Sequence, residues 1–105
     1  MFGNLGEMAK LMQKAKDIQN NMKKMKEELA TSEYSASSPG GQVCAVVTGD
    51  FQLKKITVLP EAMTDRELLE EQVFAAVNGA ISSARQAMQE KMTEVTGGVN
   101  LPGLF

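Results

Sequence analysis

Apolar side chains recur every three or four residues along the first third of the chain. Between residues 8 and 29 the spacings alternate strictly between three and four, at Met8, Leu11, Ala15, Ile18, Met22, Met25 and Leu29. This heptad pattern predicts an α-helix with a narrow apolar stripe. No Gly or Pro interrupts residues 7–38, so we expect one helix over about residues 5–30, an arm of roughly 37 Å. The stripe predicts packing against a partner helix or against the body of the domain.

Residues 31–59 carry the features of antiparallel strands. Residues 43–48 are rich in β-branched side chains, Gly49-Asp50 supplies a turn, and the segment from Phe51 to Val58 resumes the strand pattern. Leu53 and Ile56 are an odd number of positions apart, so we expect either a bulge in the second strand of this hairpin or a strand with both faces partly covered. Residues 31–36 predict an additional edge strand before the Gly- and Pro-rich break at residues 37–41.

A second helix is expected over residues 64–95. Thr64 and Glu67 have the spacing of a capping box, in which each side chain satisfies a free backbone N–H group. Two neighbouring apolar stripes follow, one with Leu69, Val73, Ala76, Ala80 and Ala87 and the other with Phe74, Val77, Ile81, Ala84 and Met88. One stripe is enough to cover the hairpin, so we expect the other to meet another subunit. Residues 96–105 are interrupted by Gly and Pro and are expected to form a flexible tail.

These elements predict a single α+β domain over residues 1–105. A long N-terminal helix, a small antiparallel sheet of two to three strands built on the hairpin and a long C-terminal helix follow one another in it. The chain contains 43% apolar residues but only four Phe, one Tyr and no Trp. Because a hairpin with one helix gives a thin core, we expect a homodimer.

The residue types that the chain lacks exclude most enzyme classes. The absence of His removes Ser-His-Asp and Cys-His arrangements and nearly every zinc site. The lone Cys44 has no internal disulfide partner and is interpreted as a small buried hydrophobic residue. The acidic group Asp65, Glu67, Glu70 and Glu71 lies in the first turns of a predicted helix, where carboxylates are favoured by the helix dipole. We therefore expect no enzyme, no cofactor, no metal and no small-molecule substrate.

The same features favour the cytoplasm over a membrane or an exported location. No apolar run approaches the ~18 residues that a membrane-spanning helix needs, and the N-terminus has no signal-peptide pattern. A single cysteine fits a reducing compartment. A basic helix lying on a membrane surface is an alternative, but the absence of Trp weakens it, and we expect no membrane partner.

The net charge of −2 hides a strong asymmetry along the chain. Residues 1–26 hold six lysines against Glu7 and Asp17, a balance of +4, whereas residues 27–105 hold five basic and eleven acidic groups, a balance of −6. A helix charged only for solubility normally interleaves both signs. The excess of lysine therefore favours contact with nucleic-acid phosphates. The candidate nucleic-acid-binding residues are Lys10, Lys14, Lys16, Lys23, Lys24 and Lys26.

The residue types also indicate which nucleic acid is expected. Lysine is a point charge without the planar fork that arginine uses to bind guanine, so a lysine arm predicts weak sequence preference. The scarcity of aromatic side chains argues against a single-strand binder that stacks bases, and favours duplex DNA.

Several short segments, in their order and spacing, resemble the YbaB/EbfC family of nucleoid-associated proteins. They are Met1-Phe2-Gly3, Leu11-Met12-Gln13-Lys14-Ala15, Gly40-Gly41-Gln42-Val43, Ile56-Thr57-Val58-Leu59-Pro60, Ala76-Val77-Asn78-Gly79-Ala80 and the tail Gly97-Gly98-Val99-Asn100-Leu101-Pro102-Gly103. The resemblance covers nearly the whole chain. It implies a small α+β homodimer in the bacterial nucleoid that projects its long helices as a pair of arms and binds DNA.

An adaptor protein is the alternative function. Methionine-rich surfaces adapt to varied partners, and this chain holds eight Met. In that interpretation the amphipathic arm binds a helix of a partner protein. Binding that is insensitive to salt, without affinity for duplex DNA, would distinguish it from the leading hypothesis.

Overall fold

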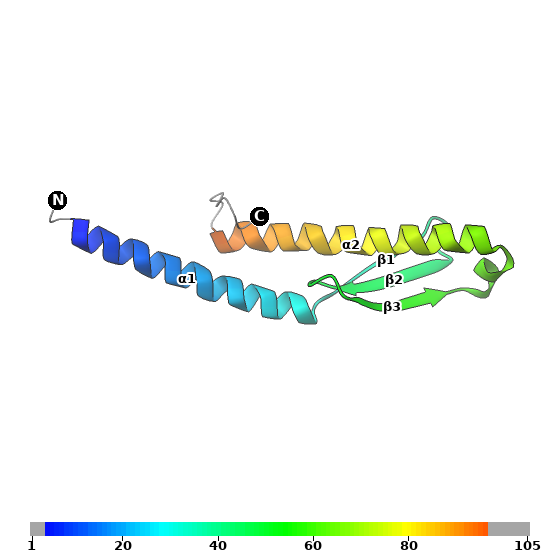
Figure 1. Cartoon of the computed structure of the whole chain (residues 1–105), viewed down its shortest axis with the longest axis horizontal. Helices are drawn as coiled ribbons and strands as arrows, with labels where there is room; N and C mark the ends of the chain where they lie inside the picture. Colours follow the sequence, from blue (N-terminus) through cyan, green and yellow to red (C-terminus); the bar gives the residue numbers. More distant parts are fainter. Residues whose placement is uncertain (1–3, 97–105) are drawn as a thin grey trace.

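The computed structural model describes residues 4–96, and Figure 1 shows them as an elongated molecule that measures 75 × 21 × 16 Å. Two long helices, α1 (Asn4–Thr31) and α2 (Arg66–Thr96), enclose in sequence the strands β1 (Glu33–Ser37), β2 (Val43–Thr48) and β3 (Leu53–Val58). A short 3-10 helix, η1 (Pro60–Thr64), links β3 to α2. The predicted tail, with its Gly97–Gly103 segment, lies outside the described residues.

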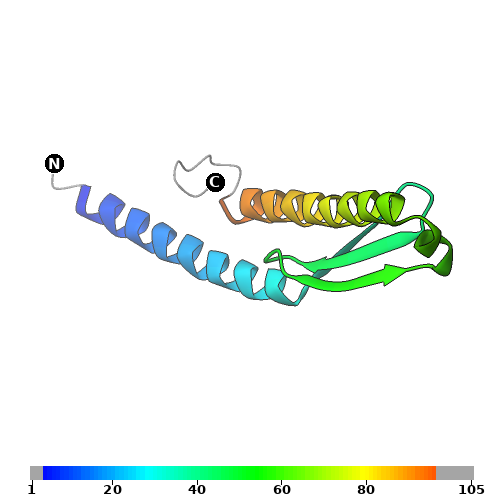
Figure 2. The ribbon, with the colours of Figure 1, turned by 45° about the vertical axis from the view of Figure 1, so that its right-hand side comes forward.

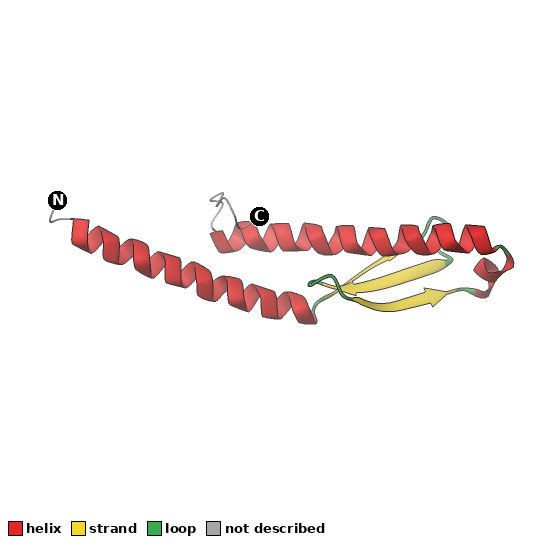
Figure 3. Cartoon of the chain, in the orientation of Figure 1, coloured by secondary structure: helices red, strands yellow, loops and turns green. Residues whose placement is uncertain are grey.

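The α+β class expected from the sequence is confirmed, with a three-stranded antiparallel sheet between the two helices in chain order (Figure 3). The strands follow the order β1-β2-β3, so that β2 is central. The loop between β1 and β2 turns on Gly40 and Gly41, whose φ angles of 87° and 76° suit residues without a Cβ.

The hairpin of β2 and β3 carries the expected irregularity. Val46 pairs with Lys55 but Val47 pairs with Leu53, so Lys54 is an extra residue on β3. The sequence predicted that the second strand of the hairpin begins at Phe51, but it begins at Leu53. Phe51 lies in the turn, where it adopts a positive φ of 66°.

Helix α2 covers one face of the sheet, over β1 and β2 (Figure 1). The alternation of β2 points Val43, Ala45 and Val47 toward α2, where they are fully buried. They meet Ala76, Ala80 and Ala84, which are also buried and whose small side chains let the helix approach the sheet closely. The core of the domain is this layer of small and β-branched side chains.

The predicted capping box at the start of α2 is wrong. Asp65 is the residue in the extended conformation, and its Oδ1 accepts a hydrogen bond of 3.2 Å from the backbone N–H of Leu68. Thr64 ends η1 instead, and its hydroxyl donates to the carbonyl oxygen of Glu61 at 3.1 Å. Pro60 starts this extra 3-10 turn, which moves the first residue of the helix forward.

Only the C-terminal half of α1 packs against the rest of the molecule. Met25 and Leu29 are buried with Met92 of α2 in a second, smaller cluster, and Met22 lies at its edge. All residues from Leu5 to Asp17 are exposed, and Figures 1 and 2 show this half running past the end of α2. The apolar stripe therefore meets the domain body over its second half alone.

Candidate nucleic-acid interface

The six candidate lysines all lie on α1 and are exposed to solvent. None of them makes an ion pair with another residue of the described range 4–96. By contrast, three of the cations outside this helix are paired with carboxylates: Lys54 with Glu33 at 2.7 Å, Arg66 with Glu70 at 3.7 Å and Lys91 with Glu28 at 3.3 Å. The arm lysines thus form the largest group of unpaired cations in residues 4–96, where Lys55 and Arg85 are also exposed and make no ion pair.

The lysines do not share one face of the helix. With about 100° between successive residues, they fall into two rows, one on each flank of the apolar stripe. One row contains Lys16, Lys23 and Lys26, and the other contains Lys10, Lys14 and Lys24. A straight duplex lying along one flank therefore reaches about three lysines of an arm, not six.

The two rows differ in their acidic neighbours. The flank with Lys10, Lys14 and Lys24 also carries Glu7, Asp17 and Glu28, which makes its sum neutral, and we call it the mixed row. The flank with Lys16, Lys23 and Lys26 holds one carboxylate, Glu27 at the base of the arm, which leaves a balance of +2, and we call it the basic row. Its other polar member is the amide of Gln19.

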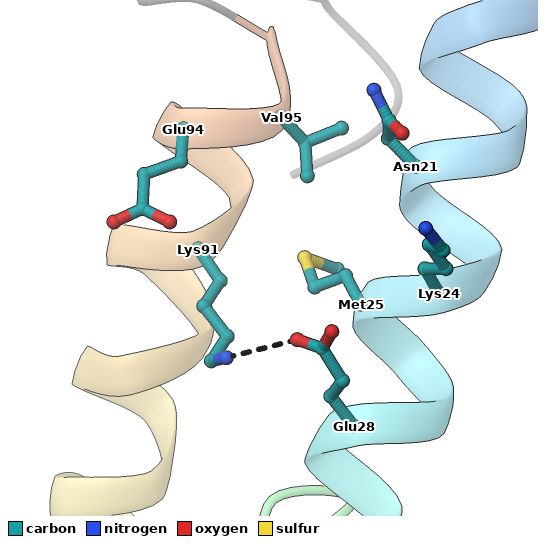
Figure 4. A pocket seen from close by; sticks show the side chains of 7 residues that line it. All are labelled: Asn21, Lys24, Met25, Glu28, Lys91, Glu94 and Val95. Carbon is teal, nitrogen blue, oxygen red and sulfur yellow. Dashed lines mark hydrogen bonds and ion pairs between the residues drawn. The ribbon is translucent and has the colours of Figure 1, made fainter.

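One carboxylate of the mixed row, Glu28, contacts α2 at the base of the arm. Figure 4 shows Met25 and Glu28 of α1 pointing toward Lys91 and Val95 of α2, with Asn21, Lys24 and Glu94 around them. These residues line an open hollow of about 180 Å³. Glu28 binds Lys91 across it. The mixed row therefore turns toward the domain body, and the basic row lies on the opposite flank of the arm.

The opposite end of the molecule is acidic. Glu61, Asp65, Glu67, Glu70 and Glu71 lie in or beside η1 and the first turns of α2, at the far end from the arm (Figure 1). Asp65 caps α2 and Glu70 binds Arg66. The charge at this end is therefore unfavourable for a polyanion.

Within residues 4–96 no cluster of three or more acidic or cysteine side chains is placed to hold a metal ion. Cys44 is half-buried on β2, where its side chain points away from α2. In the same range, neither long helix is apolar enough to cross a membrane.

All six lysines lie on one helical arm, as the sequence predicts. Their division into two rows was not part of that prediction. The signal was present, because heptad spacing assigns each lysine to a flank. The spacing does not reveal which flank of α1 faces α2. The packing of Met25 and Leu29 against Met92 determines that orientation.

Comparisons with known proteins agree with this architecture. The model of the YbaB/EbfC DNA-binding family matches residues 4–99. A protein named nucleoid-associated protein from Clostridium kluyveri is 39% identical over 106 aligned residues, which cover 99% of this chain and 93% of that protein. The crystal structure of an uncharacterized protein from Helicobacter pylori superposes with a TM-score of 0.70 over 92% of this chain and 98% of that chain. At 15% identity the latter match shows a shared fold.

Proposed function

Since this chain belongs to the YbaB/EbfC DNA-binding family, we propose that it binds duplex DNA with little sequence preference through the lysines of α1. It acts as a nucleoid-associated protein in the cytoplasm. The family is a DNA-binding family and not an enzyme class, and no small-molecule substrate is part of the proposal.

The basic row is the observation that carries the proposal. Lys16, Lys23 and Lys26 span about 15 Å along the helix axis. A duplex presents about one phosphate charge per 1.7 Å of its axis, so each of these ammonium groups has a phosphate within reach. The mixed row adds little net attraction, because Glu7, Asp17 and Glu28 offset its three lysines.

Weak sequence preference follows from the residues that the arm carries. The described arm has no arginine, and its main groups able to read a base edge are the amide side chains of Gln13, Gln19, Asn20 and Asn21. Affinity is then dominated by counterion release, which depends on the number of phosphates contacted and not on the bases.

A homodimer is the second part of the proposal. Phe74 is 72% exposed. The side chain of Gln72 reaches the β1–β2 loop on one flank of α2. Phe74 follows it by two residues, so its side chain lies on the opposite flank of α2, on the side of β3. On β3, Leu53 and Ile56 pair with inward-facing residues of β2 yet are 51% and 38% exposed, because α2 does not extend over this strand. A second copy packed here would cover this surface and the open edge of β3, and would bring two arms to one DNA molecule.

The adaptor function is the alternative, favoured by one observation. Met8 and Met12 are 56% and 68% exposed at the end of the arm, beside Leu11. Such a surface suits a partner helix, but it does not account for the unpaired lysines beside it.

Fluorescence anisotropy with labelled nucleic acids tests the proposal. The protein is titrated into a mixed-sequence duplex, a duplex of unrelated sequence and a single strand of the same length. We expect equal affinities for the two duplexes within about threefold and weaker binding to the single strand. The absence of duplex binding at low salt would refute the proposal and favour the adaptor function.

A further inference from the structure

The free end of the arm carries an apolar surface that nothing in the described chain covers. Leu5, Met8, Leu11 and Met12 are 70%, 56%, 66% and 68% exposed, and all four fall within eight residues of α1. Figure 2 shows no element beside this part of the helix. Four large apolar side chains at the tip of a polar helix exceed what solubility favours and indicate a contact surface. We call residues 5–14 the arm tip.

The spacing of these residues fits a second arm tip laid antiparallel. In a heptad, Met8 and Leu11 occupy the two core positions. When two arm tips related by a two-fold axis are placed antiparallel, Met8 of each copy faces Leu11 of the other. The same register brings Leu5 of each copy against Met12 of the other along one side of the core. All four apolar residues of both copies are then used.

The charges beside the core agree with the same register. Glu7 and Lys14 lie on the other side of the stripe from Met12, in the mixed row. Antiparallel pairing puts Glu7 of each copy opposite Lys14 of the other, which gives two intermolecular ion pairs. In the protomer neither side chain makes an ion pair with residues 4–96, although both line, together with Lys10, a shallow hollow around Leu11. A parallel pairing would instead place Glu7 near Met12 and Lys14 near Gln19, with no charge complementarity.

We propose that the arm tip is a self-association surface that binds the arm tip of a second copy in antiparallel orientation. This contact is distinct from the Phe74 surface of the domain body, and it goes beyond the proposed function because it requires no DNA. It leaves Lys16 and Lys23 of the basic row outside the paired surface. A protein with both contacts links successive dimers through their arms, with the basic rows still open to DNA.

Sedimentation velocity of the full chain without DNA tests the proposal, at several protein concentrations and at low salt. We expect a reversible association beyond the body dimer. E7K and K14E each replace two attractive pairs by two repulsive ones, and each should weaken this step about tenfold or more. An equimolar mixture of E7K and K14E restores opposite charges at both positions, so the mixture should associate like the original protein. This rescue is specific for antiparallel pairing.

L11Q removes an apolar core contact without a change in charge and should abolish the association. Q13A is the matched control, because Gln13 lies on the side of α1 opposite Met8 and Leu11, and it should leave the association unchanged. Circular dichroism verifies that each variant keeps its helix content. The proposal is overturned if the protein stays at the size of the body dimer, or if the mixture of E7K and K14E associates no better than either variant alone. It is also overturned if co-sedimentation shows that the protein binds phosphatidylglycerol vesicles through Leu11 and does not associate with a second copy. Each of these results leaves the DNA-binding proposal intact, because no DNA is present.

Discussion

The backbone N–H of Gly49 donates a hydrogen bond of 2.8 Å to the carbonyl oxygen of Leu29, which joins the end of α1 to the turn between β2 and β3. A Cβ at position 49 would lie 2.5 Å from this oxygen and 2.7 Å from the Cβ of Leu29. The approach is possible only for glycine. It fixes the base of the arm against the sheet, while the cluster of Met25, Leu29 and Met92 sets the direction of the arm.

We expect G49A to lower the free energy of unfolding by about 2 kcal/mol or more, because backbone atoms of Leu29 must move to admit the methyl group. Urea unfolding followed by circular dichroism measures the change. G6A is the matched control, since a Cβ at Gly6 meets nothing within 4 Å, and it should not destabilise the protein. Equal stability of G49A and the original chain would show that the base of the arm is not held by this contact.

The division of α1 into a packed and a free half predicts unequal effects of truncating its leucines. L29A removes a side chain that is 3% exposed and should cost about 2–4 kcal/mol of the free energy of unfolding. L11A removes one that is 66% exposed and should cost less than about 0.5 kcal/mol. Both values come from denaturant titration at low protein concentration. Comparable losses in the two variants would mean that the arm tip packs within the protomer.

A buried polar network fixes the β1–β2 loop to α2. The hydroxyl of Ser38 donates to Oε1 of Gln72 at 3.2 Å and accepts from the backbone N–H of Val43 at 3.1 Å, while Nε2 of Gln72 donates to Gln42. S38A leaves two buried groups without this partner and should destabilise the protein by about 1–3 kcal/mol. S35A, at an exposed position of β1, is the control and should change stability by less than about 0.5 kcal/mol. If S38A leaves the free energy of unfolding unchanged, the hydroxyl does not stabilise this loop, and water can take its place.

The proposed body dimer predicts that a charge at Phe74 separates the subunits. F74E introduces a carboxylate into the apolar surface shared with Leu53 and Ile56, and it should convert the dimer to a monomer in sedimentation equilibrium. The measurement is best made in the L11Q background, in which the arm-tip association is expected to be abolished. L68E changes an exposed leucine on the other flank of α2 and should leave the dimer intact. If L68E dissociates the dimer and F74E does not, the interface lies on the Leu68 flank of α2, and the proposed Phe74 interface is wrong.

Much of the fold could be predicted from the sequence, because periodicity marks α1, α2 and the hairpin directly. The cap of α2 could not, since Thr64 and Asp65 are both good caps and the choice depends on the 3-10 turn that Pro60 begins. The extent of packing on α1 could not either. Its heptad pattern continues to Met8, but α2 and the sheet reach only the part from Ile18 onward. Periodicity indicates a stripe and does not reveal where its covering element ends.

All six candidate lysines lie on α1, and their role in DNA binding stays a prediction. The helix geometry shows that the six lysines differ in their acidic neighbours. Lys16, Lys23 and Lys26 share their flank with Glu27 alone, and Lys10, Lys14 and Lys24 share theirs with Glu7, Asp17 and Glu28. This difference gives the DNA-binding proposal a test with an internal control.

The most direct test compares two triple variants with the same change in charge. Anisotropy of a labelled duplex is measured at about 50 and 200 mM salt for the original protein, for K16Q/K23Q/K26Q and for K10Q/K14Q/K24Q. With three phosphates contacted by each of two arms, we expect the original affinity to fall about 10³-fold across this range. The basic-row variant should lose most of its affinity and its salt dependence, while the mixed-row variant should keep the larger part of both. Equal losses in the two variants, or a basic-row variant that binds like the original protein, would contradict binding through the basic row.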